Sequence, residues 1–134
     1  MSNSGCQANE VGSFYSAADL FVLPAQFVDD LPIGYEAWGF TVNEAMAMGL
    51  PVIASTAVGS AYDLIRDGVT GWIFEAGDVE ALVVCLNKAV SQKGKLYEIG
   101  LQGQKWLKYQ CSYDQNVKAV LSALHLSFQH SAKD

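Results

Sequence analysis

The sequence is poor in positive charge over most of its length. Between residues 1 and 87 the only basic residue is Arg66, against eleven acidic residues. From Lys88 onward seven lysines accompany three acidic residues, and the whole chain has a formal net charge of −6. A nucleic-acid-binding surface needs a cluster of cations for the phosphate backbone. The pattern therefore argues against a nucleic-acid partner, and the lysines indicate the solvated faces of helices.

Cysteine and histidine are equally scarce. The three cysteines, Cys6, Cys85 and Cys111, are odd in number and widely spaced, and the two histidines are His125 and His130. A disulfide framework needs paired cysteines, and zinc sites place Cys and His at short, fixed spacings. We therefore expect no disulfide scaffold and no metal site. No carboxylate stands beside either histidine, so both are predicted to have surface or packing roles.

Long apolar runs are absent as well. Glycine, proline or charge interrupts every apolar stretch well before the roughly 20 residues that a membrane span needs. The N-terminal MSNSGCQANE has neither a basic end nor an apolar core, which is unlike a secretion signal. The sequence also lacks a P-loop, a G-x-G-x-x-G loop and a serine nucleophile elbow. These absences predict a soluble, cytoplasmic protein.

The chain nevertheless contains enough apolar sequence for a core. Hydrophobic residues make up 51% of its 134 residues, and the mean hydropathy is +0.16. Short apolar runs alternate with amphipathic segments. Strands are predicted at residues 20–23, 51–54 and 71–74, and helices at residues 11–18, 40–48, 61–66, 78–90, 95–108 and 112–130. Polar residues mark three of the helix starts: Ser60 paired with Asp63, Asp78 alone, and Ser112 paired with Gln115.

This alternation predicts an α/β fold with a parallel sheet, because strand–helix–strand units join parallel strands by right-handed crossovers. Three strands are few for a doubly wound nucleotide-binding sheet, which has about six. The chain is therefore predicted to be the C-terminal half of a three-layer Rossmann-like domain. Within it we expect an α/β core over residues 10–90 and C-terminal helices over residues 95–130.

The stretch YEAWGFTVNEAMAMG places two carboxylates around the start of a predicted helix. Ligands of open parallel sheets bind beyond the carboxyl ends of the strands, where this stretch is expected to lie. The free N–H groups of Gly39, Phe40 and Thr41 at the helix start favour a phosphate. Glu44, about one turn further in, can accept hydrogen bonds from two adjacent ribose hydroxyls. Glu36, before the helix, can hold hydroxyls on whatever the phosphate carries.

A second interpretation of the same residues needs no ligand. Glu36 would be a solvated loop residue, and Glu44 an exposed helix residue near a favourable N-terminus, worth about 0.3–1 kcal/mol. The chain would then be a non-enzymatic, flavodoxin-like α/β interaction or regulatory module. Trp38 fits either interpretation, since it can line a ligand pocket or the core, whereas Trp72 and Trp106 are predicted to be packing residues.

The wider sequence resembles a known family. YSAADLFVLP, EAWGFTVNEAM with the following GLPVIAS, and VGSAYDLIRDGVTGWIFEAGDVEAL are similar to the C-terminal donor-binding domain of group 1 retaining glycosyltransferases, whose GT-B fold has two Rossmann-like domains. The resemblance covers residues 11–86, and its core is the E-x7-E motif. It implies a hexosyltransferase type of enzyme whose substrate is a nucleotide-diphosphate sugar, with no cofactor and no metal.

The resemblance also implies a role for each residue of the motif. Glu36 would contact the transferred sugar as the catalytic residue, and Glu44 would bind the ribose of the donor. The amides of Gly39, Phe40 and Thr41 would hold the distal phosphate. These are the roles that the chemistry of the stretch suggests independently.

The departures from the family pattern are informative. Ala25 stands where the family usually has serine, and the loop from Ala25 to Tyr35 is longer than in many relatives. The family places an Arg and a Lys for the diphosphate upstream, in the first half of the domain, and Arg66 is not expected to reach the phosphate. The resemblance thus implies that the N-terminal acceptor domain and the first half of the donor domain lie outside this chain. The isolated chain is then expected to be inactive, and the intact enzyme to be cytoplasmic or membrane-peripheral.

The expected strand order leaves residues 20–23 at an edge of the sheet. In the doubly wound order these residues pair with the absent first strand, and they are apolar on both faces. An apolar edge strand is a template for pairing with another chain. A homodimer through this strand is therefore predicted.

Overall fold

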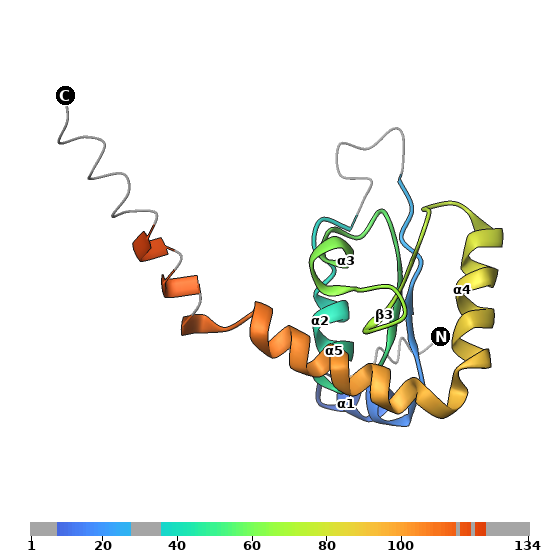
Figure 1. Cartoon of the computed structure of the whole chain (residues 1–134), viewed down its shortest axis with the longest axis horizontal. Helices are drawn as coiled ribbons and strands as arrows, with labels where there is room; N and C mark the ends of the chain where they lie inside the picture. The colour runs from blue at the N-terminus through green and yellow to red at the C-terminus, as the bar shows by residue number, and fades with distance from the viewer. Residues whose placement is uncertain (1–7, 28–35, 115, 119, 123–134) are drawn as a thin grey trace, which may run out of the picture.

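The computed structural model describes residues 8–27, 36–114, 116–118 and 120–122 (Figure 1). The element order is α1 (Ala8–Ala17), β1 (Phe21–Leu23), α2 (Phe40–Ala47), β2 (Val52–Ser55), α3 (Gly59–Leu64), β3 (Gly71–Phe74), α4 (Val79–Ser91), a short 3-10 helix (Lys93–Lys95) and α5 (Leu96–Gln110). This is the predicted order, and each strand begins within one residue of its predicted start. The described residues between 113 and 122 are helical, as predicted for the last segment.

The three strands form a parallel sheet in the order β1-β2-β3. Val22 pairs with Ile53, and Ile53 pairs with Trp72, so the strands lie in register across the sheet. Figure 1 shows α4 on one side of the sheet and α2 with α3 on the other. The predicted α/β fold with a three-layer parallel sheet is confirmed.

Each face of the sheet covers its own core, because successive side chains of a strand point to opposite faces. Ile53 of β2 packs toward α4, together with Trp72 and Cys85. Val52 and Ala54, its neighbours in the strand, pack toward α2 and α3. Burial on both faces explains why β2 and β3 are continuous apolar runs, which is typical of parallel sheets. The predicted packing role of Trp72 is confirmed, since it is 1% exposed.

Helix α5 joins the two cores. Figure 1 shows it crossing the end of the sheet at which the strands begin, after which the described residues up to 122 extend away from the sheet. Ile99 belongs to the core beneath α4, whereas Leu107, two turns later on the same helix face, belongs to the core beneath α2. At the opposite end of the sheet, where the strands finish, lie the loops that follow β1, β2 and β3.

One predicted helix cap is wrong and another is confirmed. Helix α3 begins at Gly59 with Val58 as its N-cap and no side-chain capping bond, so Ser60 lies inside the helix and does not cap it with Asp63. The helix starts earlier because its first amides bond to a neighbouring segment, as described below. Asp78 does cap α4, since its Oδ1 accepts a hydrogen bond of 2.9 Å from the Ala81 N–H.

Several other predictions concern residues at the chain ends. At Ser112 the backbone oxygen accepts from the Asn116 N–H at 3.1 Å, whereas its predicted partner Gln115 lies outside the described residues. Cys6, His125 and His130 also lie outside them. Among the described residues Cys85 and Cys111 are free thiols, and no group of three or more potential metal ligands occurs. No helix in this part of the chain is long and apolar enough to cross a membrane.

Candidate functional site

The segment that carries Glu36 is fixed by backbone hydrogen bonds to the loop between β2 and α3. The Glu36 N–H donates to the Ala57 oxygen at 3.1 Å, and the Gly59 N–H donates back to the Glu36 oxygen at 3.0 Å. The Ser60 N–H donates to the Trp38 oxygen at 2.9 Å. Residues 36–38 therefore run parallel to residues 57–60, beyond the end of β2. The start of α3 is occupied by this pairing, which is why it needs no side-chain cap.

The Glu36 side chain turns back onto the start of α2. Its Oε1 accepts a hydrogen bond of 3.1 Å from the Gly39 N–H. The first N–H groups of a helix have no partner inside the helix and carry its positive dipole end, and α2 has no acidic residue in its first turn. The Glu36 carboxylate thus lies where an anion is favoured, at the position that the sequence predicted for a phosphate.

Gly39 fits this position for two reasons. Its φ of 82° lies in the left-handed region, which side chains other than glycine rarely adopt. A Cβ atom there would also stand 2.8 Å from Val58 Cγ1. The glycine therefore allows the backbone to turn sharply from Glu36 into α2. Phe40 and Thr41 follow it in the first turn, and both are exposed, Phe40 by 73%.

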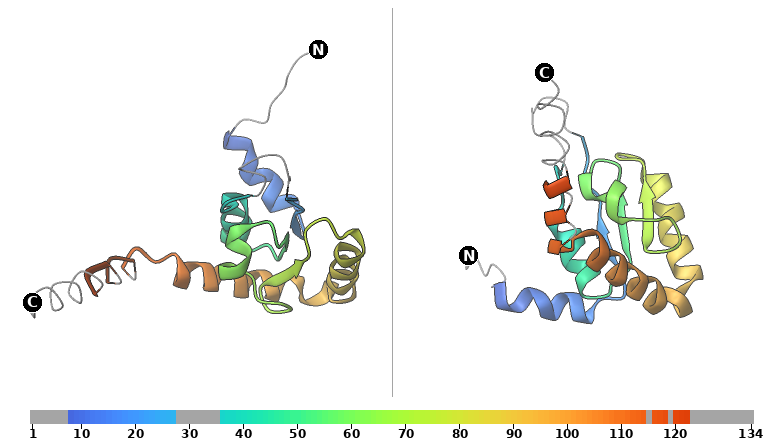
Figure 2. Two further views of the ribbon diagram at one scale, coloured as in Figure 1. Left: turned by 90° about the horizontal axis from the view of Figure 1, so that it is seen from above. Right: turned by 60° about the vertical axis from the view of Figure 1, so that its left-hand side comes forward.

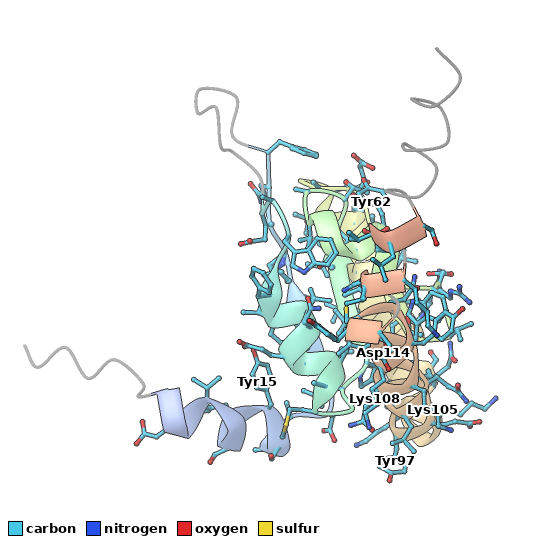
Figure 3. The ribbon with its side chains drawn as sticks, turned by 90° about the vertical axis from the view of Figure 1, so that its left-hand side faces the viewer. Tyr15, Tyr62, Tyr97, Lys105, Lys108 and Asp114 are labelled. Carbon is cyan, nitrogen blue, oxygen red and sulfur yellow. The ribbon has the colours of Figure 1, made fainter. Side chains whose placement is uncertain are left out.

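Glu44 lies further along α2 and meets a partner from another helix. The Tyr15 O–H of α1 donates to Glu44 Oε2 at 2.8 Å. Burial, followed by the hydrogen bond to Glu44 and its negative charge, raises the pKa of Tyr15 to about 12. The phenol therefore remains a hydrogen-bond donor throughout the physiological range. Figure 3 labels Tyr15 where α1 meets α2.

A pocket of about 450 Å³ opens beside this pair, between α1 and α2. Binding sites for small ligands have volumes of about 300–1,000 Å³. Its lining combines the carboxylate and the phenol with small and apolar side chains. The lining residues are Val11, Gly12, Tyr15, Glu44, Ala47 and Met48.

Trp38 lies next to the start of α2. Its Nε1–H donates to Asn43 Oδ1 at 2.9 Å, and its half-buried ring packs against the core beneath α2. Asn43 in turn donates through Nδ2 to Cys111 Sγ at 3.7 Å. The indole thus joins residue 38 to α2 through Asn43. The two interpretations of Trp38, core residue or pocket wall, are both compatible with this half-buried place.

Arg66 lies elsewhere. It belongs to the turn before β3, at the end of the sheet where strands begin, whereas Gly39 lies beyond the end where they finish. Its guanidinium carbon stands 3.5 Å from the centroid of the Trp106 ring, a cation–π contact. The Trp106 ring stacks in turn on Tyr109, with centroids 5.6 Å apart. The structure therefore does not bring Arg66 to the start of α2.

The sequence predicted Glu36, Gly39, Phe40 and Thr41 at one helix start and Glu44 about one turn further along, and the structure has these residues at those positions of α2. The sequence did not predict the contacts that fix the two carboxylates. Tyr15 is separated from Glu44 by 29 residues. No spacing rule connects residues so far apart, and only the packing of α1 beside α2 brings them together (Figure 2).

Comparison with known proteins shows where this arrangement belongs. A family model for "Glycosyl transferases group 1" matches residues 4–106. A GDP-mannose-dependent α-(1-6)-phosphatidylinositol monomannoside mannosyltransferase of Mycolicibacterium smegmatis is 28% identical over 102 residues, which are 76% of this chain and 26% of that protein. The sulfoquinovosyl transferase SQD2 of Arabidopsis thaliana is 39% identical over 83 residues, 60% of this chain and 14% of that protein.

Solved structures have the same fold. Sucrose-phosphate synthase of Thermosynechococcus elongatus aligns with a TM-score of 0.63 and 26% identity over 90% of this chain and 27% of that one. Alr3699/HepE of Anabaena, solved in complex with UDP and glucose, aligns with a TM-score of 0.62 and 24% identity over 82% of this chain and 29% of that one. The chain thus spans about a quarter of the length of the first relatives it matches. On the match over most of its residues, the chain belongs to the group 1 glycosyl transferases.

Proposed function

We propose that this chain forms the donor-sugar side of a retaining glycosyltransferase that uses a nucleotide-diphosphate sugar. The observation that carries the proposal is the start of α2, a helix N-terminus with one carboxylate bonded to its first amide and a second carboxylate further along the helix. Family membership supports it, as does the similarity to the mannosyltransferase of Mycolicibacterium smegmatis, which is GDP-mannose-dependent. The chain covers only 26% of that relative. Transfer of a sugar is an activity of the whole enzyme, so we assign it to this protein as a proposal.

In this proposal the distal phosphate of the donor lies on the amides of Gly39, Phe40 and Thr41. The phosphate replaces Glu36 Oε1 as the partner of the Gly39 N–H, since two anions cannot share one amide without strong repulsion. The released Glu36 carboxylate then faces the group attached to that phosphate. It holds sugar hydroxyls, as a carboxylate with about four acceptor positions is able to do. Glu44 accepts from the ribose hydroxyls.

The helix start also contributes to the chemical step. As the glycosidic bond breaks, negative charge grows on the leaving phosphate. Preorganised backbone N–H groups and the positive end of the helix dipole stabilise that charge more strongly in the transition state than in the ground state. No metal is required for this role, and the nucleotide-diphosphate sugar is a substrate without a further cofactor.

The isolated chain is expected to bind the donor weakly and to transfer no sugar. The described part of the chain brings no basic side chain to the α2 start, since Arg66 is held against Trp106. Two charge-assisted phosphate contacts, at about 1.5–3 kcal/mol each, correspond to roughly two to four powers of ten in rate. Donor affinity should then be about millimolar and should depend little on the base.

Ligand-observed NMR titration with UDP-glucose and GDP-mannose tests the proposal. Glu36→Ala and Glu44→Ala should each weaken binding several-fold relative to the unmodified chain. Glu80→Ala is the matched control, because Glu80 is an exposed glutamate in the first turn of α4, across the sheet. If all four proteins bind equally, or none binds, the carboxylates are surface residues. The interaction-module alternative would then be the better account.

A further inference from the structure

Tyr15 and Glu44 form a hydrogen bond between a phenol and a carboxylate. The 2.8 Å separation is the ordinary distance for a hydroxyl donor, which is about 2.7–2.8 Å. An ionised carboxylate only accepts hydrogen bonds, so the proton must come from Tyr15. Glu44 itself is exposed, and an exposed glutamate on a helix ordinarily samples several rotamers. The bond therefore restricts a side chain that would otherwise be mobile.

The Tyr15 ring is well placed to impose that restriction. It is half-buried against the core beneath α2. Its centroid lies 5.8 Å from that of Phe21 in β1, with the rings tilted by 53°, a favourable aromatic arrangement. The hydroxyl is therefore presented from a ring that the sheet holds in place. Glu44 is fixed through Tyr15 to β1, as well as by its own helix.

We propose that Tyr15 is the positioning residue that orients Glu44 toward the ribose of the nucleotide donor. This inference rests on the proposed function, in which Glu44 binds that ribose. Of the acceptor positions of the carboxylate, Tyr15 uses one on Oε2. Oε1 and the remaining position on Oε2 are then available to two hydroxyls, and a ribose offers two adjacent ones. Tyr15 touches Glu44 and not the reacting atoms, so it acts through Glu44 alone.

The pocket between α1 and α2 gives the ribose a place to lie. It has a volume of about 450 Å³ and opens on the Tyr15–Glu44 pair. Val11 and Met48 supply apolar surface for the ring face, while the carboxylate supplies the acceptors for the hydroxyl edge. Ligand pockets commonly combine an apolar lining with a few fixed polar groups. The pair thus makes the site selective for a sugar that carries both hydroxyls.

The test compares ribose with deoxyribose. The affinities of UDP and of 2′-deoxy-UDP are measured by NMR titration for the unmodified chain, Tyr15→Phe, Glu44→Ala and Tyr62→Phe. Tyr15→Phe keeps the ring against Phe21 and removes only the hydroxyl. Tyr62→Phe is the control, since Tyr62 donates to the Thr56 oxygen at 3.0 Å and lies far from Tyr15 in Figure 3. Unchanged amide shifts in β1 show that each variant keeps the fold.

The unmodified chain and Tyr62→Phe should lose about tenfold in affinity when the 2′-hydroxyl is removed, as expected for a hydrogen bond to a charged group. For Tyr15→Phe the affinity should fall only about threefold between UDP and 2′-deoxy-UDP, because the Glu44 side chain regains its rotamers. For Glu44→Ala the two affinities should be equal. If Tyr15→Phe discriminates as the unmodified chain does while Glu44→Ala does not, the positioning role is overturned and the ribose role of Glu44 survives. If the unmodified chain itself does not discriminate, the ribose role of Glu44 fails and the inference fails with it.

Discussion

A Cβ atom at Gly59 would stand 2.1 Å from the carbonyl oxygen of Ala37. This close approach is what allows the start of α3 to bond to the segment that carries Glu36. Gly59→Ala should push the two segments apart and destabilise the fold by about 1–3 kcal/mol, the usual cost of overpacking. Gly94→Ala is the matched control, since a Cβ there would meet nothing within 4 Å. Urea unfolding that gives both variants the same midpoint would contradict the close packing.

Alanine substitution of Asp78 and of Ser60, which lie near the starts of α4 and α3, should have different effects on stability. Asp78→Ala removes a capping bond of 2.9 Å and should cost about 0.5–2 kcal/mol of stability. Ser60→Ala should be neutral or slightly stabilising, because the buried Ser60 Oγ has no hydrogen-bond partner within the part of the chain that the structure describes. Thermal unfolding of the two variants checks this. A larger loss for Ser60→Ala than for Asp78→Ala would show that α3 is capped by its serine after all.

Alkaline titration should detect Tyr15 as a late-ionising tyrosine. The pKa of Tyr15 is raised from its ordinary value of 10.0 to about 12. The folded state therefore keeps a proton that the unfolded state has released between these values, so the contribution of Tyr15 to stability is complete below pH 10 and is lost as the pH rises through about 12. Phenolate absorbance should contain a late-ionising component, which Tyr15→Phe removes. A titration curve of the folded chain that Tyr15→Phe leaves unchanged at its alkaline end would refute the Tyr15–Glu44 bond.

The open side of β1 should join two copies of the chain. Among the described residues β1 pairs only with β2, and its Phe21 N–H donates to the Pro51 oxygen on that side at 3.0 Å. Alternate residues of a strand bond in opposite directions, so the peptide groups of Val22 point to the open side. Sedimentation equilibrium should therefore show a dimer, although the net charge of −6 partly opposes it.

Two substitutions of Val22 distinguish the effect of losing the outward N–H from the effect of losing core packing. Val22→Pro removes the outward N–H and should give a monomer. Val22→Ala removes a similar amount of packing against the α4 side but keeps the N–H, so it should remain a dimer. A folded monomer of the unmodified chain at high concentration, with slowly exchanging β1 amides, would mean that the edge is protected in another way.

The fold could be predicted from the sequence because short sequence patterns indicate its helices and strands. Apolar runs such as residues 71–74 and a cap such as Asp78 predict their elements from a few neighbouring residues. The predicted cap at Ser60 was wrong for the same reason. The start of α3 is fixed by backbone bonds to residues 36–38, which no local pattern reveals. The site divides in the same way. The motif predicted the carboxylates, whereas the contact between Tyr15 and Glu44 depends on how two helices pack.

The measurement that most directly tests the central claim is a map of backbone amide shifts during titration with a nucleotide-diphosphate sugar. The account predicts the largest changes at Gly39, Phe40 and Thr41, with the Gly39 amide changing most as it exchanges Glu36 for phosphate. The competing place for an anion is the pocket of about 220 Å³ at the other end of the sheet, whose lining includes Arg66 and Lys105. Changes confined to that pocket, with the α2 start unaltered at saturating donor, would contradict the account.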